Sequence, residues 1–315
     1  MVSTSQTQDS TTLPSVSPRG RVMKQSTREA IYGFAMASPW ILGFLVFTLG
    51  PVAASFIIGL YRTNFLNSTE FVGLHWYRSL FVDTLVHKAL INTAYYSFVT
   101  VPLGTVLALT IAVMLNQGIR AQGFWRTVYY LPSVVSAVAV SLLWRWLYEP
   151  EIGLLNTVLK WFGIEGPRWI FSTEWAMPSI IIMGLWWSAG APMLIYLAGL
   201  RSIPTSLYEA AEIDGASSFR RFFAITLPLL TPTIFFNVVL GIIGSWQVFD
   251  QALIMTNGGP DNATLTAVLH LYRTGFQNNF FGYASAQGWL LFLVVMIFVI
   301  LALRSSSSWV TYDRV

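Results

Sequence analysis

Residues 209–216 read EAAEIDGA, and this polar stretch lies between two uncharged apolar runs, residues 175–200 and 222–249. An α-helix needs about 20 apolar residues to cross the ~30 Å hydrocarbon core of a bilayer. Both runs are long enough, and neither shows the alternation of a barrel strand, so both are predicted to be membrane-spanning helices. The polar stretch is therefore predicted to be held at one face of a membrane.

Four further charge-free runs of this kind occur, at residues 31–61, 89–119, 127–144 and 274–303. The chain of 315 residues is 55% hydrophobic and only 10% charged, whereas an average soluble domain is about 25% charged. The sequence predicts an all-α polytopic membrane protein with six transmembrane helices. The expected organisation is a disordered cytoplasmic tail (1–30), a six-span domain (31–303) with a cytoplasmic segment at 201–221, and a cytoplasmic C-terminal tail (304–315).

Lys and Arg residues set the expected orientation, because they are enriched on the cytoplasmic side of membrane proteins. Both tails and the two loops on their side of the membrane carry 11 of these residues, and the other three loops carry 7. Both termini are therefore expected to face the cytoplasm.

Several kinds of chemistry are disfavoured by the composition. The chain has no cysteine, and His75, His87 and His270 are far apart in the sequence, so we expect no metal site and no cofactor. The 18 Lys and Arg residues are scattered, which argues against nucleic-acid binding. No Gly-x-x-x-x-Gly-Lys-Ser/Thr loop occurs, so we expect neither ATP binding nor catalytic residues, and the chain is not expected to be an enzyme.

The cytoplasmic segment 201–221 is predicted to form a helix, a glycine turn at Gly215 and a second short helix over 217–223. Pro204 suits a first helical turn, and Ser206 and Glu209 have the spacing of a capping box. Its small residues and its carboxylates are Ala210, Ala211, Ala216, Glu209, Glu212 and Asp214. The small residues would let a partner surface approach closely, and the carboxylates would anchor it. From the spacing alone, an interfacial helix in which Glu209 caps its own backbone is equally open.

These residues resemble a known family. The run 209–216 followed by FFAITLP at 222–228 is similar to the EAA motif of permease subunits of binding-protein-dependent ABC importers. Further similarity to the carbohydrate branch of these permeases, the MalF and UgpA type, lies in FVGLHWY (71–77), GFWRT (123–127), LP (131–132), WRWLYEP (144–150), GLLN (153–156), TNGGP (256–260) and FGYAS (281–285). The resemblance covers about residues 31–303.

The resemblance implies that the EAA segment is a coupling helix in a cleft of an ATPase subunit. Glu209 would pair with a basic residue there, Gly215 would give the bend, and Ala210, Ala211 and Ala216, beside Asp214, would allow close packing. The implied partners are a second homologous permease, two ATP-binding subunits, an extracytoplasmic solute-binding protein, a carbohydrate substrate and membrane lipid. ATP would be bound by the partner, and the location would be the cytoplasmic membrane of a prokaryote.

A possible substrate pathway lies in the later spans. Gly241, Gly244, Ser245 and Val248 share one helix face at spacings of three and four residues. Close helix packing through small residues is the simpler interpretation of this face. The resemblance implies instead that it lines the substrate chamber, together with Trp187, Ser188 and Ala191 of the fourth span. Trp187 could then stack on the apolar face of a sugar ring.

Two alternatives from other classes remain open at this point. An ion-coupled secondary transporter commonly places ionisable side chains inside its spans, and the six runs contain none, although carbonyl and hydroxyl groups can also bind sodium. A non-transporting membrane scaffold has the same composition, but it gives no reason for polar residues along the later spans.

Overall fold

The computed structural model describes residues 25–63 and 69–311, in two compact units that comprise residues 1–54 and 55–315. The first unit contains α1 (Gln25–Phe44), a π-helical turn (Leu45–Leu49) and the start of α2 (Gly50–Ile58). No side chain described from residue 29 to residue 54 is buried. Residues 25–30 are already helical, so the expected disordered tail is too long, and its residues 1–24 lie outside the described part of the chain.

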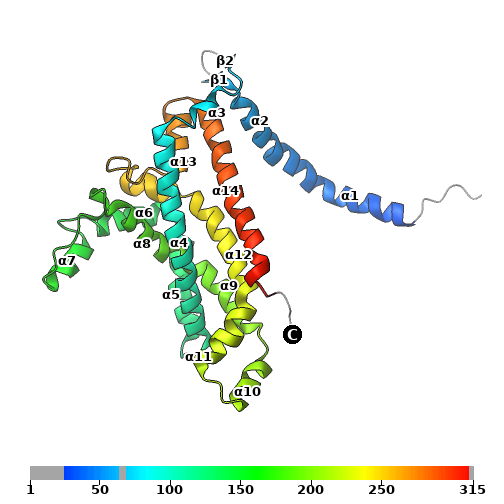
Figure 1. Cartoon of the computed structure of the whole chain (residues 1–315), viewed down its shortest axis with the longest axis vertical. Helices are drawn as coiled ribbons and strands as arrows, with labels where there is room; N and C mark the ends of the chain where they lie inside the picture. Colours follow the sequence, from blue (N-terminus) through cyan, green and yellow to red (C-terminus); the bar gives the residue numbers. More distant parts are fainter. Residues whose placement is uncertain (1–24, 64–68, 312–315) are drawn as a thin grey trace, which may run out of the picture. The chain divides into compact units, whose positions relative to one another are not determined.

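The second unit is built almost entirely from helices (Figure 1). Two short antiparallel strands, β1 (Tyr61–Thr63) and β2 (Thr69–Phe71), pair Arg62 with Glu70. The helices are α3 (His75–Ser79), α4 (Thr84–Asn116), α5 (Gln122–Val134), α6 (Ala137–Leu147), α7 (Leu154–Trp161), α8 (Ala176–Ser188), α9 (Gly190–Arg201), α10 (Thr205–Ile213), α11 (Ser218–Arg221), α12 (Leu227–Trp246), α13 (Ala267–Tyr272) and α14 (Phe281–Trp309). A 3₁₀ turn (Trp169–Phe171) and π-helical turns at Phe222–Thr226, Ala252–Thr256 and Arg273–Gln277 complete the list.

The predicted spans agree with these helices, with two of them bent. Four helices, 29–58, 84–116, 218–246 and 281–309, are long and apolar enough to cross a membrane. The pairs α5–α6 and α8–α9 bend by 96° and 46° at short breaks, and each pair counted as one span gives six. A hydropathy pattern does not reveal such bends, because the apolar character continues through the break.

The last span differs from its predicted range of 274–303. Residues 274–277 belong to the π-helical turn after α13, because Asn279 is in the left-handed conformation (φ 59°) and separates that turn from α14. At the other end α14 continues to Trp309, six residues into the expected C-terminal tail. Ser305, Ser306 and Ser308 satisfy their hydroxyls on carbonyls of the same helix, three residues back, which lets the helix tolerate a polar stretch.

Helix α4 is the centre of the second unit, with α8, α9, α12 and α13 packed against it. Figure 1 shows α12 and α14 running beside it. Ala108 and Ala112 of α4 are fully buried against Met193 and Leu197 of α9. Small side chains bring the two helix backbones close together, which is how helices associate where lipid removes the hydrophobic driving force.

Asn156 of α7 fixes the long loop between α6 and α8. Its amide nitrogen donates to the carbonyls of Pro150 (3.1 Å) and Pro167 (3.2 Å), and its oxygen accepts from the indole of Trp169 (2.7 Å). The side chain is buried. A single amide side chain therefore holds α7 to both ends of this loop.

We expect Asn156→Ala to cost about 2–3 kcal/mol, because three partly buried partners lose their hydrogen bonds together. Thermal unfolding of the detergent-solubilised protein would measure the loss. Asn116→Ala is the control, since Asn116 is exposed at the end of α4. Equal melting temperatures for the two variants would show that Asn156 does not hold the loop.

Candidate functional site

A cavity of about 430 Å³ lies among α4, α8, α9 and α12. Its wall is formed by Tyr96, Thr100 and Gly104 from α4, Gly184, Trp187 and Ser188 from α8, Pro192 and Tyr196 from α9, Asn237, Gly241, Gly244 and Ser245 from α12, and residues 247–251 after α12. The wall therefore combines aromatic rings with hydroxyl, amide and glycine surfaces.

Six of the seven residues predicted for a substrate pathway meet at this cavity: Trp187, Ser188, Gly241, Gly244, Ser245 and Val248. Ala191 does not line it. The 46° bend falls at Ala189, between α8 and α9, so the helical phase of Trp187 and Ser188 does not carry over to Ala191, which is exposed elsewhere.

The glycines of the spans divide into two kinds. A Cβ on Gly244 would meet no atom within 4 Å, and one on Gly241 would reach Val101 at an ordinary 3.5 Å. A Cβ on Gly184 would lie 2.6 Å from the Tyr96 hydroxyl, and one on Gly199 would lie 2.8 Å from Leu230. Close helix packing therefore occurs at Gly184 and Gly199, whereas Gly244 faces open space.

Two hydrogen bonds hold the wall in place. The indole of Trp187 donates to the Val135 carbonyl (3.2 Å), at the break between α5 and α6 where that carbonyl has no helical partner. The hydroxyls of Ser245 and Ser97 are 2.6 Å apart and join α12 to α4. The hydrogen bond to Val135 thus fixes the orientation of the Trp187 ring in the cavity wall.

Sequence reasoning missed part of the wall, above all Asn237, Gln247, Asp250 and Gln251. Asn237 carried a usable signal, because a polar amide inside an apolar span is costly and tends to serve a site. Asp250 and Gln251 follow directly after the end of the fifth run, and only the fold turns them back to the cavity.

At the opposite end of α9 and α12 lies the segment that contains the EAA sequence. Helix α10 ends in a Schellman motif, in which the N–H of Gly215 donates to Glu212 (3.0 Å) and that of Ala216 donates to Ala211 (2.9 Å). Gly215 has φ +73°, a conformation that costs other residues about 1–2 kcal/mol. The glycine turn predicted at this position is present for that reason.

Two details of this segment differ from expectation. No capping box forms, because α10 already begins at Thr205 after Pro204, which places Ser206 inside the helix and leaves Pro204 without a side-chain cap. The carboxylates of Glu209 and Asp214 make no hydrogen bond or ion pair to any described residue, so Glu209 does not cap its own backbone.

The second short helix is continuous with the fifth span. Helix α11 begins after Ser217, which caps it, and the helix runs from Ser218 through Trp246. Arg221 at its start forms an ion pair with Glu212 of α10 (2.9 Å). Tyr208 and Thr226 also join the two elements through their hydroxyls (2.8 Å). These contacts join α10 to the helix that carries Gly241 and Gly244.

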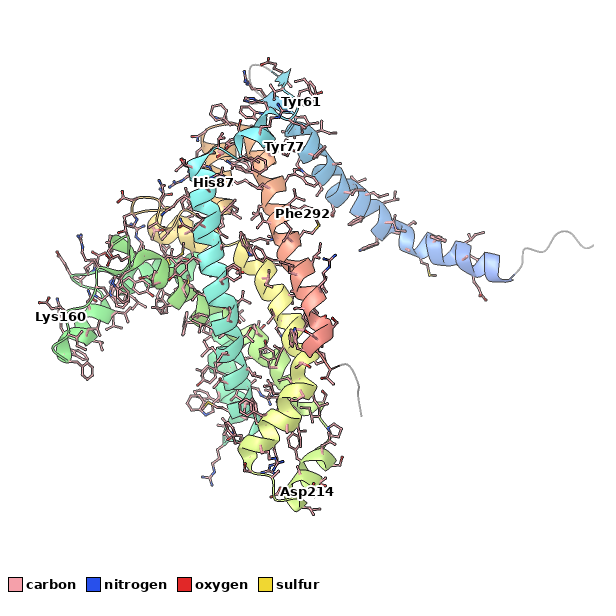
Figure 2. The ribbon with its side chains drawn as sticks, in the orientation of Figure 1. Tyr61, Tyr77, His87, Lys160, Asp214 and Phe292 are labelled. Atoms are coloured by element: carbon pink, nitrogen blue, oxygen red, sulfur yellow. The ribbon has the colours of Figure 1, made fainter. Side chains whose placement is uncertain are left out.

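The tip of this segment is exposed. Figure 2 shows Asp214 at one end of the second unit and Tyr61 at the other. Ile213 and Phe219 flank the glycine turn with 87% and 75% of their surface exposed. Apolar side chains this exposed, beside unpaired carboxylates, are typical of a protein-binding surface.

Comparison with known proteins identifies the family. Residues 101–311 match the family described as binding-protein-dependent transport system inner membrane component. The chain belongs to this family. It is 36% identical over 291 residues to the probable ABC transporter permease protein YesP of Bacillus subtilis, covering 91% of this chain and 94% of YesP. It is 35% identical over 282 residues to the trehalose/maltose transport system permease protein MalF of Thermococcus litoralis, covering 89% and 95%.

Solved structures agree with this family assignment. A chain of a bacterial alginate ABC transporter, solved in complex with its alginate pentasaccharide-bound periplasmic protein, superposes with a TM-score of 0.79 at 27% identity. The match covers 91% of this chain and 97% of that chain. The fold is thus that of a type I ABC importer permease, and the resemblance stated from the motifs is confirmed.

This family is a class of multi-pass membrane permease subunits. The chain works with a solute-binding protein and with separate ATPase subunits, which hydrolyse the ATP, and it is not itself an enzyme. Membership in the family decides against an ion-coupled secondary transporter and against a scaffold.

Gly244→Trp should be accommodated by the cavity, so we expect the importer to assemble in normal amount and to lose uptake by at least tenfold, because the added ring fills the space. Gly199→Trp should instead clash with Leu230 and lower the yield of assembled complex. Complex yield and solute uptake, measured in parallel, test this. A drop in yield for Gly244→Trp as large as that for Gly199→Trp would assign Gly244 to helix packing.

Proposed function

We propose that this chain forms half of the pathway by which an ABC importer moves a carbohydrate across the membrane. The observation that carries the proposal is the cavity beside Trp187 and Gly244. Its volume of about 430 Å³ falls in the ~300–1,000 Å³ range of small-molecule sites. A sugar ring has apolar faces and a rim of hydroxyls, and this wall supplies an aromatic face together with hydroxyl and amide groups.

The named relatives support the carbohydrate class. Besides the trehalose/maltose permease, the lactose transport system permease protein LacF of Rhizobium radiobacter is 36% identical over 273 residues, covering 85% of this chain and 91% of LacF. These disaccharides differ in linkage and in the sugars they join, so they indicate the class of substrate and leave its identity open. The remaining half of the pathway would come from a second, homologous permease.

We further propose that the segment around α10 docks into a cleft of one of two ATPase subunits. Glu209 and Asp214 are free to pair with basic residues there, and Ala210, Ala211 and Ala216 leave room for close approach. Ile213 and Phe219 would bury their exposed surface against the cleft. Glu212 has a different role from the one expected, because it is held by Arg221 and joins α10 to the fifth span.

Both termini are proposed to face the cytoplasm, with the EAA segment on the same side. The Lys and Arg distribution supports this orientation, and so does the need to bring α10 to an ATPase. The loop that contains α7 would then lie outside, where a solute-binding protein docks.

The function is tested by coexpressing the chain with its partner permease, ATPase and solute-binding protein and measuring uptake of labelled maltose, trehalose, lactose and arabinooligosaccharides. We expect uptake of at least one of these sugars.

A second variant tests the docking surface around α10. We expect Ile213→Asp to lower both sugar uptake and ATPase co-purification by at least tenfold, because it places a charge in an apolar contact. Glu165→Lys, a charge change on the exposed outer loop, should leave ATPase co-purification intact. Full ATPase retention by Ile213→Asp would remove this residue from the docking surface.

Orientation can be read from single cysteines, because the chain has none of its own. Thr173→Cys lies just before α8 and Thr205→Cys begins α10, and both positions are exposed. In intact cells, a membrane-impermeant maleimide should label position 173 and reach position 205 only after permeabilisation. The reverse labelling would place α10 outside and contradict ATPase docking.

A further inference from the structure

Asp250 is the only charged side chain in the wall of the cavity. The wall contains no Lys, Arg or His among the residues the structure describes. Asp250 lies just past the end of α12, between Gln247 and Gln251, which also line the cavity. Among the described residues, the wall of the cavity therefore carries one negative charge and no compensating positive charge.

The Asp250 carboxylate is partly exposed, and no described residue donates a hydrogen bond or forms an ion pair with it. Two arginines in contact with the segment that follows are engaged elsewhere. Arg145 donates to the Ile254 carbonyl (3.1 Å), and Arg273 binds the carbonyl and the side-chain oxygen of Asn257. Asp250 directly precedes Gln251, the N-cap of the π-helical turn Ala252–Thr256, and no side chain caps that turn.

An unpaired carboxylate in such a place suits a polyhydroxylated ligand. Its two oxygens accept only, and they can accept from two neighbouring hydroxyls at once, with the added strength of a charged acceptor. The amides of Gln247 and Gln251 offer donors and acceptors on either side. A ligand that carries its own carboxylate or sulfonate would instead bring a like charge close to Asp250, with no cation in this wall to offset it.

We propose that Asp250 binds substrate hydroxyls and acts as the charge filter of the cavity, which selects neutral carbohydrates over acidic ones. The inference rests on the proposed carbohydrate pathway and narrows its substrate class. It separates this chain from the structurally similar importer of alginate, which is described as an acidic polysaccharide. The names of the similar proteins by themselves are compatible with both neutral and acidic carbohydrates.

The first experiment compares Asp250→Asn with Asp261→Asn in the whole importer. The substitutions are chemically identical, and Asp261 is exposed on the loop after the cavity segment without lining the cavity. We expect Asp250→Asn to lower uptake of the best-transported sugar of the neutral panel by about tenfold, the loss of one charge-assisted hydrogen bond. Complex yield and melting temperature should stay unchanged, because Asp250 has no partner in the described part of the chain. Asp261→Asn should transport normally.

The outcomes separate this inference from the proposed function. A wild-type importer that takes up none of the sugars would overturn both. Normal uptake by the wild type together with equal uptake by Asp250→Asn would overturn only the role of Asp250. A lower melting temperature or complex yield for Asp250→Asn would show that the carboxylate pairs with another subunit, and that also contradicts the inference.

The second experiment tests the charge filter without the solute-binding protein, which has a selectivity of its own. Saturation-transfer NMR on the permease–ATPase complex in nanodiscs compares maltose with digalacturonate. We expect the wild type to bind maltose with higher affinity than digalacturonate. We expect Asp250→Asn to reduce the ratio of the two affinities by about tenfold, because the repulsion between Asp250 and the digalacturonate carboxylates is removed. Equal binding of both sugars to the wild type would overturn the charge filter.

Discussion

In a hydrocarbon environment, every backbone N–H and C=O must find its partner within the protein, and the rest of this structure depends on that constraint. It makes the spans helical, and it confines irregular backbone to places where the protein can satisfy it. The breaks at Ala189 and after Trp246 adjoin the cavity, and the break at Val135 is joined to its wall through Trp187. At that break the freed carbonyl of Val135 accepts from Trp187. The break at Val135 thus fixes an aromatic ring of the cavity wall.

The cavity is connected through the fifth span to α10, the helix proposed to dock on the ATPase. Helix α10 contains no membrane-spanning residues, yet it contacts the fifth span through the Glu212–Arg221 pair and the Tyr208–Thr226 hydroxyls. Residues 218–246 form one continuous helical stretch, so the base of this stretch and the glycines of the cavity wall belong to one element. The Schellman motif at Gly215 is the bend between α10 and this helical stretch. The proposed coupling would therefore run along one helix that α10 holds at its base.

Charge has a different meaning in the two regions. On the exposed α10, unpaired carboxylates cost little because water solvates them, and they remain available to a basic partner. In the cavity wall, an unpaired carboxylate has acceptor oxygens that remain available for hydrogen bonds from a bound ligand. Asp250 thus gives the cavity a chemical preference that its aromatic and glycine surfaces do not provide. The glycines set the size of the space, Trp187 supplies the stacking face, and Asp250 sets the charge that is accepted.

The sequence by itself determined the six spans, the polar EAA segment between two of them, the need for a glycine at position 215 and the family. It did so because apolar run length and short motifs are local properties, readable along one dimension. Only the tertiary structure decided that α5–α6 and α8–α9 are bent, that Gly244 faces open space while Gly199 is packed, and that Ala191 is turned away from the cavity. Likewise, Asn237 and Asp250 reach the cavity wall only through the fold. Each of these outcomes depends on where a helix breaks and on which neighbour fills the space beside it, and a bend of 46° changes the face on which every later residue lies.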